Sequence, residues 1–182
     1  MKANDYDLPH LAEIFQMLSS GRHICLSDGK YFYAIQNDLN NFTAFFKALK
    51  YDLITHPKEF YYFKAHTGNK NNNKSTQQMA LFVFILIEHL DKKEADLVNQ
   101  LMSQRFSIEN LPHLKTERYT ELMKEVGVTE QERIRSILET LQKYGFVILH
   151  DNDTFDFKTP IHRFFDLCVA ELKKAELDKG EI

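Results

Sequence analysis

The chain has 182 residues, of which 43% are hydrophobic and 27% are charged, and its formal net charge is −3. This length suits one ordinary domain or two small ones, and 6 glycines and 4 prolines are too few for a disordered or fibrous protein. The slight negative charge excludes a strongly basic nucleic-acid coat, so any contact with DNA must come from a local basic patch.

The first 64 residues predict helix, strand, two helices and a hairpin, which is the order of a winged-helix domain. The expected elements are a helix from near Leu8 to a glycine cap at Gly21, an extended segment at 22–26, helices at 30–36 and 38–50, and strands at 51–55 and 60–64. The second long helix should have one apolar face, made by Leu39, Phe42, Phe45, Phe46 and Leu49.

Residues 65–76 are polar, rich in asparagine and free of large apolar side chains. Such a segment is typical of a linker, so we predict an N-terminal winged-helix domain at 1–64 and a C-terminal one, with extra helices, at 77–182. The fold class that follows is mainly α with small β-hairpins, in tandem winged-helix domains.

The second half repeats the order of the first, with insertions. The expected elements are a helix at 76–90, helical segments at 93–104 and 116–126, a short strand at 106–108, a helix from Glu130 to Tyr144 that ends at Gly145, strands at 146–149 and 155–158, and a last helix from Pro160 to Glu176. Thr129 and Glu132 fit a capping box. The helix at 76–90 is apolar on nearly every side from Met79 to Ile87, which predicts that it is buried.

Nothing in the sequence predicts an enzyme, a metal centre or a cofactor. The eight histidines are scattered, and no phosphate-binding loop, nucleophile elbow or Cys-X-X-Cys pair occurs. The segment from His150 to Asp153 could hold a cation, although polar residues that satisfy a hairpin turn explain it better. Cys25 and Cys168 lie in apolar stretches, which favours buried, reduced thiols. The longest apolar run is too short to cross a bilayer, so we expect a cytoplasmic protein without membrane contact.

Candidate DNA contacts fall in two places. Between Phe60 and Ile87 there is no acidic residue, whereas Lys64, Lys70 and Lys74 are present. These lysines could follow a phosphate backbone, or they could only keep a linker soluble.

The second place is the helix at 130–144, which would be the groove-facing helix of the second winged domain. Arg135 and Lys143 face outward, with Arg133 on the other flank, but Glu132 and Glu139 share that face and oppose phosphates. Weak, sequence-independent DNA contact and simple pairing of these arginines with glutamates both remain open.

Two blocks of sequence resemble the MukE/MksE family, the E subunits of bacterial condensins of the MukBEF and Mks types. The first is Gly21-Arg22-His23-Ile24 together with the aromatic run Phe60-Tyr61-Tyr62-Phe63. The second runs from Glu132-Arg133-Ile134-Arg135 through Tyr144-Gly145-Phe146 to Arg163-Phe164. The chain looks closer to MksE than to MukE, because the acidic C-terminal tail of MukE is largely missing.

The resemblance implies a non-enzymatic subunit that dimerises, binds a kleisin of the MksF or MukF type, and reaches an SMC ATPase of the MksB or MukB type through it. In MukE, basic residues on the last groove-facing helix contact DNA, and Arg135 and Lys143 match such positions. Gln142 stands where MukE has an arginine, which implies a weaker contact. The complex would be nucleoid-associated and serve chromosome organisation and segregation, or plasmid exclusion. The alternatives are a winged-helix transcription regulator and a protein-interaction module without DNA contact.

Overall fold

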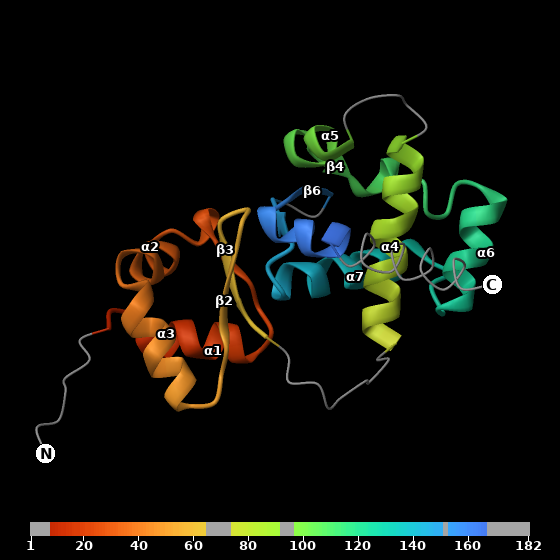
Figure 1. Cartoon of the computed structure of the whole chain (residues 1–182). Helices are drawn as coiled ribbons and strands as arrows, with labels where there is room; N and C mark the ends of the chain where they lie inside the picture. Colours follow the sequence, from red (N-terminus) through yellow and green to blue (C-terminus); the bar gives the residue numbers. More distant parts are fainter. Residues whose placement is uncertain (1–7, 65–73, 92–96, 151–152, 167–182) are drawn as a thin grey trace, which may run out of the picture. The chain divides into compact units, whose positions relative to one another are not determined.

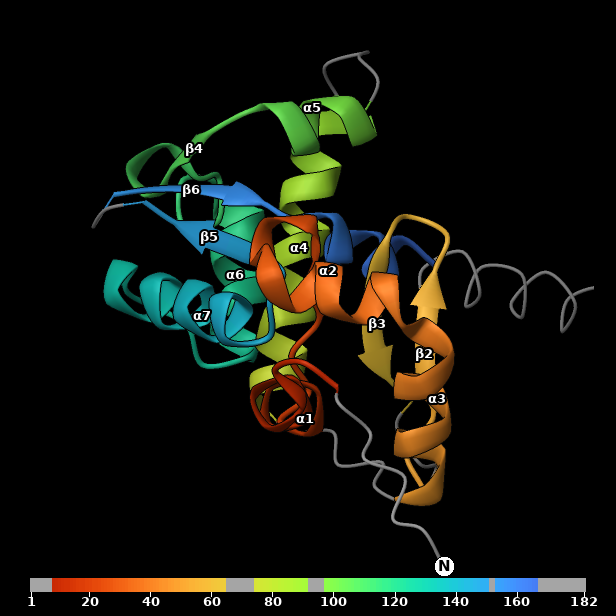
Figure 2. The same ribbon diagram turned by 90° about the vertical axis from the view of Figure 1, so that its left-hand side faces the viewer.

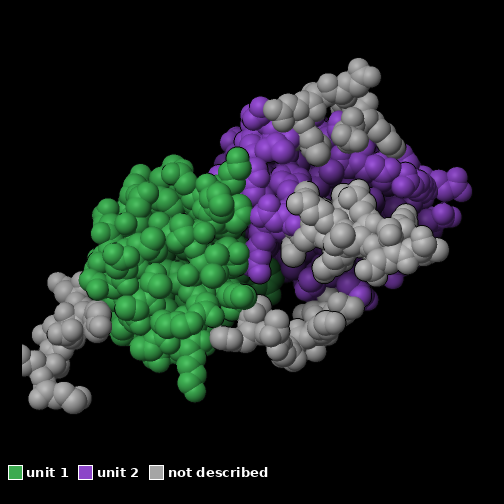
Figure 3. All heavy atoms as spheres, in the orientation of Figure 1, with its two compact units in different colours: residues 1–70, 143–145 green, residues 71–142, 146–182 purple. Residues whose placement is uncertain are grey.

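The computed structural model describes residues 8–64, 74–91, 97–150 and 153–166. The chain forms two compact units, which Figure 3 shows in different colours: unit 1 consists of residues 1–70 and 143–145, and unit 2 of residues 71–142 and 146–182. Helices predominate in both, and each has a small three-stranded antiparallel sheet (Figure 1). The fold class is therefore the mainly α one with small β-hairpins that the sequence predicts.

Unit 1 has the predicted order of elements. They are α1 (Leu11–Ser19), β1 (Ile24–Cys25), the 3-10 turn η1 (Leu26–Asp28), α2 (Lys30–Asn37), α3 (Leu39–Ala48), β2 (Leu53–His56) and β3 (Phe60–Phe63). Strand β3 lies between β1 and β2 and is antiparallel to both, with Cys25 opposite Phe60 and His56 opposite Phe60 on its two sides. The hairpin of β2 and β3 is the element that a winged-helix domain would use as its wing.

Aromatic side chains fill the core of unit 1. Phe42 and Phe46 of α3 are fully buried, and the ring of Phe46 lies 4.9 Å from that of Phe63 on β3, centroid to centroid. The predicted apolar face of α3 is thus largely right, but Leu49 is 46% exposed. The helix ends at Ala48, so Leu49 no longer follows the helical stripe.

Three helices end in glycines with positive φ, as the sequence predicts for two of them. After α1, Gly21 has φ 87° and the N–H of Arg22 donates to the carbonyl of Met17. Gly145 (φ 82°) and Gly127 (φ 75°) take the same place after later helices. Helix α3 closes with the same hydrogen bond, from Tyr51 N–H to the Phe46 carbonyl, but its residue with positive φ is Lys50, at 66°.

Unit 2 contains the remaining elements. They are α4 (Lys74–Asp91), α5 (Leu97–Ser103), β4 (Phe106–Ser107), η2 (Ile108–Asn110), α6 (Glu117–Glu125), α7 (Gln131–Lys143, whose last residue clusters with unit 1), β5 (Val147–Leu149), β6 (Thr154–Phe157) and the 3-10 turn η3 (Thr159–Ile161). Strand β6 lies between β4 and β5, and Figure 2 shows the three side by side. Residues 162–166 are helical, and the rest of the predicted last helix lies outside the described residues.

Helix α4 begins at Lys74, so the last three residues of the predicted linker belong to it. The Gln78 side chain in its first turns donates to the Val126 carbonyl at 2.9 Å, which ties this end of α4 to the end of α6. The expectation of burial from Met79 to Ile87 is wrong at two positions, because Phe84 is 49% exposed and Ala80 is also exposed. The neighbours of Phe84, which are Phe82, Val83 and Ile85, are buried.

Helix α7 has the predicted stripe: Ile134, Ile137, Leu138 and Leu141 are all buried. It begins at Gln131, one residue after the predicted start, which is within the usual uncertainty of helix boundaries. Cys25 is buried and free, whereas Cys168 and Lys70 lie outside the described residues. Among the described residues, no helix is long and apolar enough to span a bilayer.

Candidate nucleic-acid interface

The outward face of α7 carries Arg135, the first of the predicted DNA contacts. Its Nε lies 3.8 Å from a carboxylate oxygen of Glu139 one turn later, and both side chains are partly exposed. An exposed pair of this kind contributes little to stability and can open for another anion. A phosphate would therefore have to compete with the Glu139 carboxylate for Arg135.

Arg135 also lines an open pocket of about 390 Å³ at the first turns of α7. The pocket lies between this helix, η2 and the start of β6, and its lining residues are Ile108, Glu109, Gln131, Glu132, Arg135 and Asp153. Three carboxylates thus surround one guanidinium. The negative charge of these carboxylates repels a phosphate backbone, which weakens the contact between Arg135 and DNA that the sequence predicts.

The other two basic residues of this helix are Arg133 and Lys143. Both are exposed, and the Lys143 ammonium lies 5.8 Å from the centroid of the Tyr144 ring. Because Arg133 and Arg135 are two positions apart on a helix, they point about 160° away from each other. The three side chains therefore do not form one basic patch.

The described lysines of the acid-free stretch lie on different elements. Lys64 follows β3 in unit 1, is exposed, and its N–H donates to the Asp52 carbonyl at 2.9 Å. Lys74 opens α4 in unit 2, where its side chain lies across the turn at Gly127: a Cβ added there would be 2.7 Å from the ammonium nitrogen. The lysines thus belong to different elements of different units.

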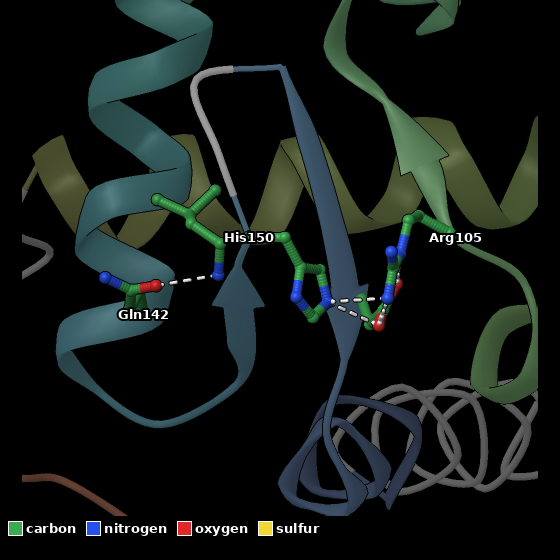
Figure 4. A network of polar contacts seen from close by, with 5 residues as sticks. Arg105, Gln142 and His150 are labelled. Atoms are coloured by element: carbon green, nitrogen blue, oxygen red, sulfur yellow. Dashed lines mark hydrogen bonds and ion pairs between the residues drawn. The ribbon is translucent and has the colours of Figure 1, made fainter.

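Gln142 fixes the hairpin that follows α7. Its side-chain oxygen accepts a hydrogen bond of 2.7 Å from the backbone N–H of Leu149 on β5, as Figure 4 shows. The Gln142 side chain is therefore engaged within unit 2. This contact was not predicted from the sequence, because no local pattern relates Gln142 to a strand seven residues later.

A second polar network crosses the same sheet (Figure 4). The guanidinium of Arg105 donates to both carboxylate oxygens of Asp156 at 3.1 and 3.2 Å, and the His150 ring lies 2.6 Å from one of them. The hydrogen bond from Arg105, and next that from His150, hold the pKa of Asp156 below its usual value. His150 thus links the two strands of the hairpin through Asp156. In the described part of the chain, no group of side chains could hold a metal ion.

Helix α3 of unit 1 presents a surface that the sequence analysis did not select. Asn40, Thr43, Ala44 and Lys47 are all exposed on it. The signal that could have revealed this surface is the lack of any acidic residue between Leu39 and Tyr51. We name these four positions the α3 face.

Comparison with known proteins gives one family. The family model described as condensin complex protein MksE matches residues 9–169, which include most of both units. No curated protein matches the chain. The match covers far more than half of the sequence, and it agrees with the two blocks that resemble this family. The chain therefore belongs to the MksE family of condensin complex proteins.

Proposed function

We propose that this protein is the non-catalytic accessory subunit of a condensin-like SMC complex, and that it binds the kleisin and contacts DNA weakly. The family match over residues 9–169 carries the proposal. The order of helices and strands in each unit supports tandem winged-helix domains, at 1–64 and 77–182, because the hairpin follows the third helix in unit 1 and α7 in unit 2. Winged-helix domains serve both protein and DNA recognition.

The partners proposed are a kleisin of the MksF or MukF type, an SMC ATPase of the MksB or MukB type reached through the kleisin, and a second copy of this chain. Phe84 on α4 and Ile148 on β5 are 49% and 42% exposed, and a partner that covers them would bury apolar surface. The complex would act on the nucleoid in the cytoplasm. Chromosome organisation and plasmid exclusion are both compatible with it.

The partners can be tested without assuming any surface. Light scattering of the full chain should give the mass of a dimer, and purification from its native cell should bring down a kleisin and an SMC ATPase, identified by mass spectrometry. A strict monomer at high concentration that also fails to bind a co-encoded kleisin would contradict the proposal.

Contact with DNA should be weak and independent of sequence. Arg135 and Lys143 are the main candidates on α7, with Arg133, Lys64, Lys70 and Lys74 as further cations. The carboxylates beside Arg135 remove base preference and reduce affinity, so the isolated protein should bind in the non-specific range, about 10⁻⁴ to 10⁻⁶ M.

Reversing two charges on α7 tests this contact. The double variant Arg135→Glu with Lys143→Glu should bind duplex DNA more weakly for every sequence, with a salt slope reduced by about 0.9 for each lost contact. Dimer formation and kleisin binding should not change. The measurement is a titration of fluorescent duplexes by both proteins at several salt concentrations.

Two outcomes of this titration would change the assignment. Unchanged affinity and slope would show that α7 takes no part in DNA contact and would favour an interaction module. A strong preference for one operator-like duplex would favour a transcription regulator, which is the alternative in another class.

A further inference from the structure

The α3 face has the composition of a surface that approaches duplex DNA closely. Its four positions, Asn40, Thr43, Ala44 and Lys47, lie within about 100° of arc around the helix. The buried Phe42 and Phe46 occupy the opposite side. None of the ten residues of α3 is acidic. Two short side chains and an amide leave the backbone accessible, whereas on α7 Glu132 and Glu139 stand in the corresponding direction.

These residue types match the chemistry of the major groove. Asparagine can donate to and accept from an adenine edge, the methyl groups of alanine and threonine can contact a thymine methyl, and lysine can reach a guanine or a phosphate. Helix α3 also precedes a hairpin, the arrangement in which the second helix of a helix-turn-helix enters the groove. Carboxylates, as on α7, can only accept hydrogen bonds, so they match the amino groups of cytosine and adenine and no other group in the major groove.

Lys50 supplies an independent observation. It has φ 66°, a left-handed conformation that glycine adopts with less strain than a residue with a side chain. The same position after α1, α6 and α7 is occupied by Gly21, Gly127 and Gly145. The lysine therefore places an exposed ammonium group at this end of α3, where the other three helices have a glycine.

Two carboxylates border the face without entering it. The Lys47 ammonium lies 2.5 Å from an oxygen of Asp52, and the lysine side chain is 71% exposed. Such an exposed pair opens at little cost, so a phosphate can replace the carboxylate. Asp38, at the other end, accepts a hydrogen bond from the amide of Asn41 at 3.1 Å.

We infer that the α3 face and Lys50 form a duplex-DNA contact surface of unit 1, distinct from the predicted contact on α7 and stronger than it. The inference rests on the proposed function only in taking DNA as the partner. Acid-free composition, groove-compatible side chains and an exposed lysine at one end of the same helix carry it.

A pair of glycine variants tests Lys50 without risk to the fold. Lys50→Gly removes both a charge and the strain, so the thermal midpoint should stay equal or rise. Loss of one phosphate contact should weaken duplex binding by about tenfold at about 50 mM salt and about threefold at about 200 mM, and lower the salt slope by about 0.9. Glu59→Gly is the matched control, because Glu59 also has positive φ (58°) and lies outside α3. It should keep wild-type affinity or exceed it.

A charge series on Ala44 tests the face itself. Ala44→Glu should weaken binding and Ala44→Arg should strengthen it and steepen the salt slope by about 0.9. Gln16, an exposed residue of α1 in the same unit, receives the same two substitutions as a control for non-specific charge effects. If both positions respond equally, or if Ala44→Arg and Lys50→Gly bind as the wild type does, the inference is overturned.

The full chain, titrated with one set of duplexes beside the α7 double variant, separates the two surfaces. Loss of binding in the α3 variants alone supports α3 and removes α7 from the proposed function. Loss in the α7 variant alone overturns the inference and leaves the proposed function intact. If the α3 variants lose kleisin binding or the dimer but keep DNA, the face is a protein-docking surface and the inference fails.

Discussion

Replacing Phe46 by alanine should lower the free energy of unfolding by about 3–5 kcal/mol, the usual cost of removing a fully buried phenylalanine. The ring is completely buried, and its centroid lies 4.9 Å from that of Phe63, 5.8 Å from that of Phe42 and 6.1 Å from that of Phe15. The loss combines lost apolar burial with an unfilled cavity between α3 and the sheet. Because small domains are stable by only about 5–15 kcal/mol, unit 1 should become marginal.

Urea unfolding followed by circular dichroism measures this effect. Leu49→Ala is the matched control, since Leu49 belongs to the same segment but is 46% exposed. It should cost less than about 1 kcal/mol. Equal losses in the two variants would show that α3 is not held to the core by Phe46.

Acidification should destabilise unit 2 through His113. Burial, only partly offset by the hydrogen bond to the Phe82 carbonyl, lowers the pKa of this imidazole from 6.5 to about 4. The ring stacks on Phe82 at 4.2 Å, and its Nε2–H donates to that carbonyl at 2.8 Å. Nδ1 has no partner among the described atoms. The folded state therefore holds the neutral ring while the unfolded chain takes up a proton below pH 6.5.

The sign follows from this difference in protonation. Above pH 6.5 both states are neutral and stability is complete, and it falls as the pH drops toward 4, where the folded state also becomes protonated. Between about pH 7.5 and 4.5 the loss should be about 2.5 kcal/mol. His113→Gln should flatten this part of the pH profile. Identical profiles for the wild type and His113→Gln would contradict the assignment.

The sequence predicted the elements well where local physics decides them. The buried stripe of α7 follows from apolar residues at helical spacing, and Gly21 and Gly145 end their helices because only glycine adopts positive φ without strain. Lys50 was missed for the same reason: a lysine gives no signal for a left-handed conformation. Leu49 was assigned to the apolar face because the pattern continues past the point at which the helix ends.

The candidate site was less predictable, because it depends on contacts between distant residues. The sequence shows that Arg135 faces outward on α7, but not that Glu109 and Asp153 share its pocket. It likewise cannot relate Arg105 to Asp156, which lies 51 positions later. Phe84 lies on a side of α4 that stays exposed, although the helix has apolar residues on all sides. A uniformly apolar sequence does not say which side that is.

The hydrogen bond from Leu149 to Gln142 has a consequence for the assembly of the protein. Strand β5 is an outer strand of its sheet, and an outer strand with free backbone donors invites another chain to add a strand beside it. The side-chain oxygen of Gln142 accepts a hydrogen bond of 2.7 Å from one such donor, the Leu149 N–H. This N–H is therefore not open to an added strand beside β5. A partner should therefore not add a strand beside β5 at Leu149, and Gln142→Ala should expose this edge to unwanted self-association.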